Sequence, residues 1–212
     1  MLEAGVWSAY QLEKTLSPHQ VYRAAEGTVR PCRWDKYRRG DNTPSVATRA
    51  FIAGRFRGAQ NRWDSPIWRI FKGEVPSRSD IVHGLANLVP DIAMFLTEQA
   101  GGNTVLQPIS ADFFDLIEQT VSYDTFETMV LIAVLADIIH DEQLREVVTN
   151  IYRLRRRDLM EDHIISRLHS ELFGYADTVC RPRWRTSRGE IVYIDFPWSA
   201  GYPYRQSGGK GR

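Results

Sequence analysis

The basic side chains best suited to binding a partner gather in one short stretch, residues 30–39, which reads RPCRWDKYRR. Lysine and arginine neutralise phosphates, and arginine also pairs with the edge of guanine. A helix over 31–39 would place Arg33, Lys36 and Arg30 on one exposed side. Trp34 and Tyr37 would share another side, because they are three residues apart. This pattern is typical of a recognition helix, which docks by one face and offers its cations to DNA by the other.

The residues that follow resemble a known family. Tyr37-Arg38-Arg39-Gly40, then three residues, then Pro44-Ser45 is similar to the end of the recognition helix in lambda-repressor/Cro-like helix-turn-helix proteins. The resemblance covers residues 17–58, where FIAGRF at 51–56 is similar to the family's fourth helix. It implies a small helical domain that contacts double-stranded DNA. The DNA-binding residues that it implies are Arg30, Arg33 and Lys36, with Arg38 and Arg39 contacting phosphates.

Charge is strongly segregated along the 212 residues, although the net formal charge is only +1. Residues 1–78 carry +7, residues 79–151 carry −11, and residues 152–212 carry +5. A basic N-terminal block favours a polyanionic partner. Two alternatives stay open. The acidic and basic blocks would attract each other within one fold, or the stretch 30–39 would be a solvated helix end whose cations complement the helix dipole.

A second basic cluster, YRLRRRDL at 152–159, admits the same two interpretations. One is a solvated helix end that pairs with the acidic middle of the chain, and the other is an extension that contacts phosphates. Arg153, Arg155, Arg156 and Arg157 point several ways round a helix, so they cannot all enter a core.

Histidines beside carboxylates raise the question of a metal site. A His-Asp doublet occurs in metal-dependent phosphohydrolases, so His140, Asp141 and His163 are candidate ligands of one metal. Ligand pairs on a helix are three or four residues apart, however, whereas His163 and His169 are six apart. We therefore expect surface or capping histidines, no catalytic residues and no cofactor. Asp112, Asp115 and Glu118 are predicted to form a solvated acidic face.

Three Ser/Thr-Pro pairs predict where helices begin: Ser17-Pro18, Thr43-Pro44 and Ser65-Pro66. Gly27 and Gly73 are expected to end the first and third of these helices, and Gly40 is expected to end the helix over 31–39. After a linker at 74–80, apolar residues spaced three and four apart predict four or five helices packed as a bundle. His140 to Gln143 would break the longest of these segments in two. The run 191–196 predicts one short strand, followed by an extended aromatic tail.

These elements predict a mainly α protein with three parts. A basic helix-turn-helix-like domain occupies residues 1–76, an acidic helical bundle occupies 77–180, and a short strand with an extended tail occupies 181–212. The longest apolar run, 129–139, is shorter than a membrane span requires. Cys32 and Cys180 are expected to be free thiols, which favours a cytoplasmic location.

Three functions follow from these expectations. The first is a DNA-binding regulatory protein of prokaryotic or phage type, whose bundle mediates dimerisation or partner contact and whose affinity falls with salt. The second is a non-enzymatic adaptor or inhibitor that uses the acidic bundle, with the aromatic tail as a further docking element, to engage a basic partner or to imitate nucleic acid. The third is a metal-dependent hydrolase built on His140 and Asp141.

Overall fold

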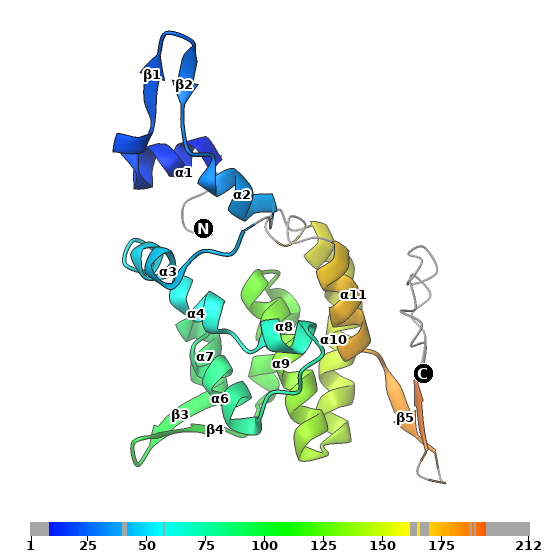
Figure 1. Cartoon of the computed structure of the whole chain (residues 1–212). Coiled ribbons are helices and arrows are strands. Elements are labelled where there is room, and N and C mark those ends of the chain that lie inside the picture. The colour runs from blue at the N-terminus through cyan, green and yellow to red at the C-terminus, as the bar shows by residue number, and fades with distance from the viewer. Residues whose placement is uncertain are drawn as a thin grey trace, which may run out of the picture. The chain divides into compact units, whose positions relative to one another are not determined.

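The structure is a computed structural model that describes residues 9–39, 42–56, 58–161, 165, 170–186, 188 and 190–193. The described chain is mainly helical, which confirms the expected fold class, and its strands pair only as short antiparallel hairpins. It divides into two compact units, residues 1–64 and 65–212. Figure 1 shows the elements of each unit.

The first unit combines short helices with a β-hairpin. Its elements are α1 (Ala9–Leu16), the 3-10 turn η1 (Pro18–Gln20), β1 (Tyr22–Ala24), β2 (Gly27–Val29), α2 (Arg33–Arg39), α3 (Val46–Ala53) and α4 (Ala59–Asp64). Helices α1 and α2 pack together, and so do α3 and α4. The hairpin extends away from α1 in Figure 1.

The prediction of a helix between Ser17 and Gly27 is wrong. Pro18 begins only one turn of 3-10 helix, and the Ser17 side chain caps none of its N–H groups. The chain then forms the hairpin, in which Tyr22 pairs with Val29. Tyrosine, threonine and valine favour strands. Gly27 does not end a helix but opens β2, with a φ of 129° that suits glycine.

The next two helices lie close to where the sequence placed them, with shifted ends. Helix α2 begins at Arg33 rather than Pro31, and Cys32 before it adopts a left-handed backbone with φ of 51°. Helix α3 is capped by Ser45 rather than Thr43, because the Thr48 backbone N–H donates to Ser45 Oγ at 3.2 Å. Pro44 therefore lies just ahead of the cap.

The second unit is built around one buried helix. Its elements are α5 (Ile67–Phe71), α6 (Arg78–Ala86), α7 (Pro90–Leu96), β3 (Thr97–Ala100), β4 (Asn103–Leu106), α8 (Ala111–Gln119), α9 (Tyr123–Ile139), α10 (Glu142–Glu161), α11 (Ser170–Val179), β5 (Arg183–Arg185) and β6 (Ile191–Tyr193). Residues 123–133 of α9 are all buried. A helix that is apolar all round must be enclosed, and α5, α6, α10 and α11 pack against α9.

The helix that follows Ser65-Pro66 belongs to this second core. Ile67, Ile70 and Phe71 of α5 are buried in the cluster that surrounds α9. Ser65 joins the two elements, since its hydroxyl donates to Glu127 of α9 and accepts from the Ile67 backbone N–H. The division between the units therefore falls before α5, ahead of the linker at residues 74–80.

Two hairpins of this unit were not expected. Strands β3 and β4 are joined by Gly101 and Gly102, whose φ values of 58° and 82° suit the two-residue turn of a hairpin. Strand β6 matches the start of the predicted strand but pairs with β5. The tail from 194 onward lies outside the described residues. No helix in the described ranges is both long enough and apolar enough to cross a membrane, and the cytoplasmic location stays a prediction.

Candidate nucleic-acid interface

A buried carboxylate fixes the start of α2. The Glu13 side chain of α1 is 1% exposed and accepts from Arg30 Nη1 at 3.1 Å. Its other oxygen accepts from the Trp34 backbone N–H at 3.4 Å, in the first turn of α2. Arg30 also pairs with Asp35 at 2.6 Å and lies over the Tyr10 ring, 5.9 Å from its centroid. This ion-pair cluster ties α1 and the end of the hairpin to α2.

The electrostatics of Arg30 follow from this cluster. Partial burial by itself would lower the pKa of the guanidinium, but the Glu13 hydrogen bond and the Asp35 charge together raise it above the ordinary value. Arg30 was predicted to contact DNA. The structure places its guanidinium against two acids of the same unit, which is a positioning role rather than an exposed one.

Trp34 and Tyr37 contact each other on α2 as predicted, but Tyr37 is not on a side separate from the cations, because it lines one pocket with Arg33 and Lys36. Trp34 and Tyr37 share one side of the helix and meet edge to face, with ring centroids 5.6 Å apart and an interplanar angle of 89°. Both side chains are half-buried rather than fully buried. Few apolar side chains are buried in the described part of this unit: Ala9, Leu12, Leu16, Ile52 and Ala59.

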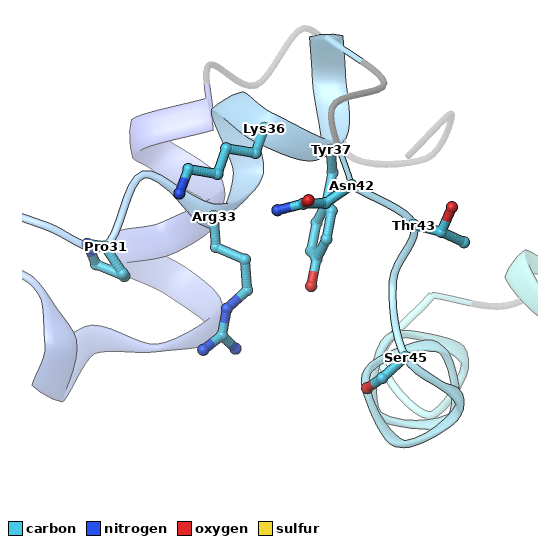
Figure 2. A pocket seen from close by; sticks show the side chains of 7 residues that line it. All are labelled: Pro31, Arg33, Lys36, Tyr37, Asn42, Thr43 and Ser45. Carbon is cyan, nitrogen blue, oxygen red and sulfur yellow. The ribbon is translucent and has the colours of Figure 1, made fainter.

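Arg33 and Lys36 are the other two predicted DNA-binding residues whose side chains the structure describes, and both line a pocket. Arg33 and Lys36 are exposed, and neither forms an ion pair with any residue that the structure describes. The pocket measures about 390 Å³, and its lining residues are Pro31, Arg33, Lys36, Tyr37, Asn42, Thr43 and Ser45. In Figure 2, Arg33 and Tyr37 extend from α2 in the same direction, and Lys36 extends toward Pro31. This polar hollow is the candidate site.

Arg38 and Arg39 complete the predicted set. Both belong to the last turn of α2, but their side chains lie outside the described part of the structure. Thus α2 brings Arg33 and Lys36 together at one pocket, while Arg30 is engaged inside the unit.

The second basic cluster is largely paired with carboxylates. Arg156 makes a two-pronged contact with Asp177 of α11, at 2.7 Å to each oxygen, and Asp177 also accepts from the Tyr152 hydroxyl at 2.8 Å. Arg155 pairs with Asp158 at 2.8 Å, and Arg157 with Glu161 at 3.1 Å. These observations favour the helix-end interpretation. Asp158 and Glu161 belong to α10 itself and Asp177 belongs to α11, so these partners do not come from the acidic middle of the chain.

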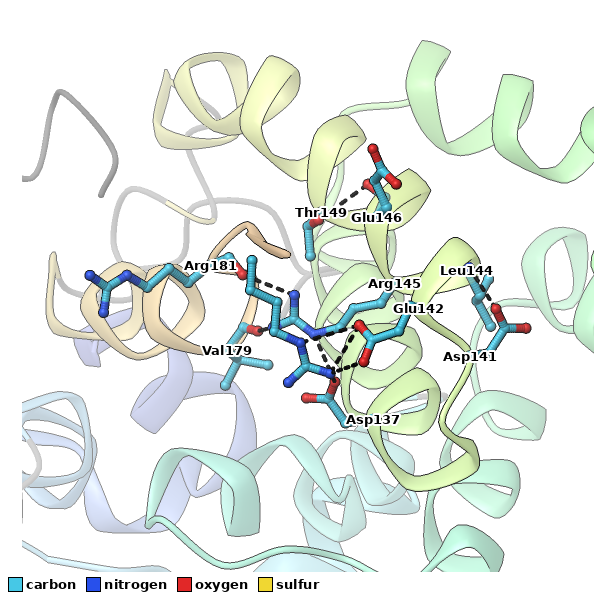
Figure 3. Close-up of polar contacts among 10 residues, drawn as sticks. Asp137, Asp141, Glu142, Leu144, Arg145, Glu146, Thr149, Val179 and Arg181 are labelled. Carbon is cyan, nitrogen blue, oxygen red and sulfur yellow. Dashed lines mark hydrogen bonds and ion pairs between the residues drawn. The ribbon is translucent and has the colours of Figure 1, made fainter. Parts of the chain in front are cut away.

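Sequence analysis missed a second ion-pair centre, shown in Figure 3. Arg145 of α10 is 3% exposed and donates to Asp137 at 2.7 Å. It also donates to the backbone carbonyls of Val179 and Arg181, at 2.9 Å each, at the end of α11. Arg183 joins through Asp137 at 2.6 Å. The one signal in the sequence was that Arg145 is the only cation in residues 79–151.

Two of the candidate metal ligands, His140 and Asp141, lie at the junction of two helices. His140 is exposed and ends α9 in a left-handed conformation with φ of 59°, while Asp141 caps α10 by accepting from the Leu144 backbone N–H at 2.9 Å. The predicted helix break at 140–143 is thereby confirmed. His163 and His169 lie outside the described ranges. Among the residues within those ranges, no three His, Cys, Asp or Glu side chains are grouped as metal ligands would be.

Comparison of the chain with protein-family models, with curated proteins and with solved structures found no match. Any function assigned to the chain therefore rests on its own residues and on their arrangement.

Proposed function

We propose that this chain is a DNA-binding regulatory protein of prokaryotic or phage type, and that its N-terminal unit contacts the DNA. One observation carries the proposal. Arg33 and Lys36 stand exposed on α2, beside a pocket of hydroxyl and amide groups, and within the described residues no acid neutralises them. Cations that stay exposed are those available to phosphates.

The charge of the first unit supports the same proposal. Residues 1–64 carry a formal charge of +5. Two of the acids in this unit, Glu13 and Asp35, are already engaged by Arg30. The surface left for a partner is therefore more basic than the sum suggests, and a basic surface attracts polyanions.

The resemblance to helix-turn-helix proteins stays a hypothesis within this proposal. A helix capped by Ser45 follows α2. The segment that directly precedes α2 is a hairpin instead of a helix, and the helix that packs against α2 is α1, which precedes that hairpin. In the same proposal the second unit serves dimerisation or partner contact.

The test is a gel-shift titration of the full chain on random-sequence duplex DNA at several salt concentrations. Arg33→Glu with Lys36→Glu should weaken binding by roughly tenfold or more, because each charge reversal removes a favourable contact and adds a repulsive one. Lys72→Glu is the matched control: Lys72 is an exposed cation of the second unit. If the wild-type chain fails to bind at low salt, or the double variant binds like the control, the proposal is wrong.

A second candidate function rests on α8. Asp112, Asp115 and Glu118 are exposed on this helix and form no ion pair with other described residues. An uncompensated acidic face suits a basic protein partner, which fits an adaptor or an inhibitor. Co-purification from the native host with wild-type chain and with Asp112→Asn/Asp115→Asn/Glu118→Gln would test it. A partner lost only from the variant would favour this function.

A further inference from the structure

We infer that the α2 pocket holds a single phosphate group, bound by Arg33 and Tyr37 with Lys36 adding charge. The inference rests on the proposed function and deepens it, because it assigns this site to the DNA backbone rather than to the bases. Recognition at this pocket would then be independent of DNA sequence.

The shape of the site is the first argument. Arg33 and Lys36 line a hollow of about 390 Å³ between α2 and the segment that leads to α3. The hollow is open and both cations are exposed, so a group that protrudes toward it reaches them first. On duplex DNA the phosphates protrude, whereas base edges lie at the floor of a major groove about 8.5 Å deep. The concave site therefore matches a phosphate.

The chemistry of the lining is the second argument. Among the described residues that line the pocket there is no carboxylate, so an anion bound there meets no like charge from these side chains. Arginine presents a planar fork that binds phosphate oxygens in pairs. Figure 2 shows the Tyr37 hydroxyl extending the same way as the Arg33 guanidinium, so both can donate to one group. Lys36 has a flexible stem and adds a point charge.

The third argument is that each wall is ordered locally by contacts of its own. Tyr37 rests edge-on against Trp34, and Glu13 binds the first turn of α2 through the Trp34 backbone N–H. On the opposite wall, the Ser45 hydroxyl is occupied by Thr48 at the start of α3. Among the described residues that line the pocket, the side-chain donors left for a ligand are Arg33, Lys36, Tyr37, Asn42 and Thr43.

The first experiment tests phosphate binding without DNA. Inorganic phosphate is titrated into the full chain while NMR follows the Nε–H signals of arginine. We expect the Arg33 signal to shift in the wild type. Tyr37→Phe keeps the ring against Trp34, and loss of the hydroxyl should weaken phosphate binding about fivefold. Arg33→Lys should weaken it more, because lysine cannot bind in the forked geometry. Arg23→Gln, on the exposed hairpin, should leave binding unchanged.

The second experiment asks whether the phosphate belongs to DNA. Binding to two unrelated duplexes is measured against salt for wild type, Arg33→Gln, Lys36→Gln and the double variant. A plot of log K against log salt has a negative slope. If both cations bind one phosphate, the magnitude of this slope should be smaller by about 0.9 in the double variant than in the wild type, on both duplexes equally. A fall near 1.8 would mean two phosphates, and a loss confined to one duplex would mean base contacts. Either result overturns the inference.

The two experiments separate the inference from the proposed function. Phosphate binding at Arg33 without any DNA binding keeps the phosphate pocket, assigns it to a free phosphate or nucleotide, and ends the DNA proposal. DNA binding that is insensitive to Arg33→Gln, with no phosphate shift, ends the inference alone.

Discussion

At the scale of single residues, Arg30 and Arg33 show how position decides the use of a cation. They are three residues apart, yet Arg30 is bound to Glu13 and Asp35 whereas Arg33 is exposed. The difference comes from Glu13, which lies 17 residues before Arg30 and is buried. A buried carboxylate requires a partner, and Arg30 is the cation within reach.

Replacing Arg30 should therefore destabilise the first unit. Arg30→Met leaves Glu13 buried without its cation, which should cost about 3 kcal/mol of unfolding free energy. Urea denaturation followed by circular dichroism measures the loss. Lys14→Met is the control, because Lys14 is exposed beside Glu13 on α1. Equal stabilities of the two variants would contradict a positioning role for Arg30.

Arg145 is the corresponding residue of the second unit. Arg145→Met removes the guanidinium that joins Asp137 to the end of α11 and leaves two carbonyls without their donor. We expect a loss of roughly 3 kcal/mol in unfolding free energy. Arg153→Met, an exposed position on the same helix, should change stability by less than about 0.5 kcal/mol. Similar thermal unfolding midpoints for the two would refute this assignment.

At the scale of elements, close approach between α6 and the start of α5 depends on one glycine. A Cβ added at Gly84 would lie 2.6 Å from Pro66 Cγ, in a ring that cannot rotate away. Gly174 in α11 has open space around it instead. Glycine is therefore required for close packing at position 84, whereas the structure leaves room for a larger side chain at position 174.

This contrast gives a matched pair of substitutions. Gly84→Ala should lower the unfolding free energy by about 1–3 kcal/mol, because Pro66 and α6 must move apart. Gly174→Ala should raise it by about 0.5–1 kcal/mol, since alanine loses less conformational entropy in a helix. Thermal unfolding of both variants checks the signs. A stabilising Gly84→Ala would show that the two elements do not pack this tightly.

At the scale of the whole molecule, the two free cysteines report on different units. Cys32 is half-buried in the first unit, and Cys180 is fully buried in the core of the second, as expected for unpaired thiols. Burial raises the pKa of Cys180, and nearby Arg145 offsets only part of this. Burial likewise raises the pKa of Tyr152, with a smaller contribution from Asp177.

Stability should consequently fall at alkaline pH. Both groups are neutral below their unfolded pKa values, about 8.5 for cysteine and 10 for tyrosine. Above those values the unfolded state releases protons that the folded state retains, so the unfolding free energy declines as pH rises. Urea titrations from pH 7 to 10.5 measure this. In Cys180→Ala the decline should begin near pH 10 instead of near 8.5. An unchanged onset would mean that Cys180 ionises freely.

The parts of the fold that the sequence predicted are those decided within a few residues. The helix break expected at His140 to Gln143 is present, because His140 ends α9 and Asp141 caps α10 by accepting from the Leu144 backbone N–H. Caps and breaks of this kind involve groups three residues apart, so the local sequence contains all of the information. The contact between Trp34 and Tyr37 was predictable for the same reason, because the two residues are three apart on one helix.

The sequence by itself determined a mainly helical protein with segregated charge, and it located the cations of residues 30–39. Only the tertiary structure decided which of those cations can meet a partner, because Glu13 selects Arg30 from 17 residues away. It also turned residues 22–29 into a hairpin and placed α5 in the second core. These outcomes depend on burial among distant side chains, and spacing along the chain contains no record of that burial.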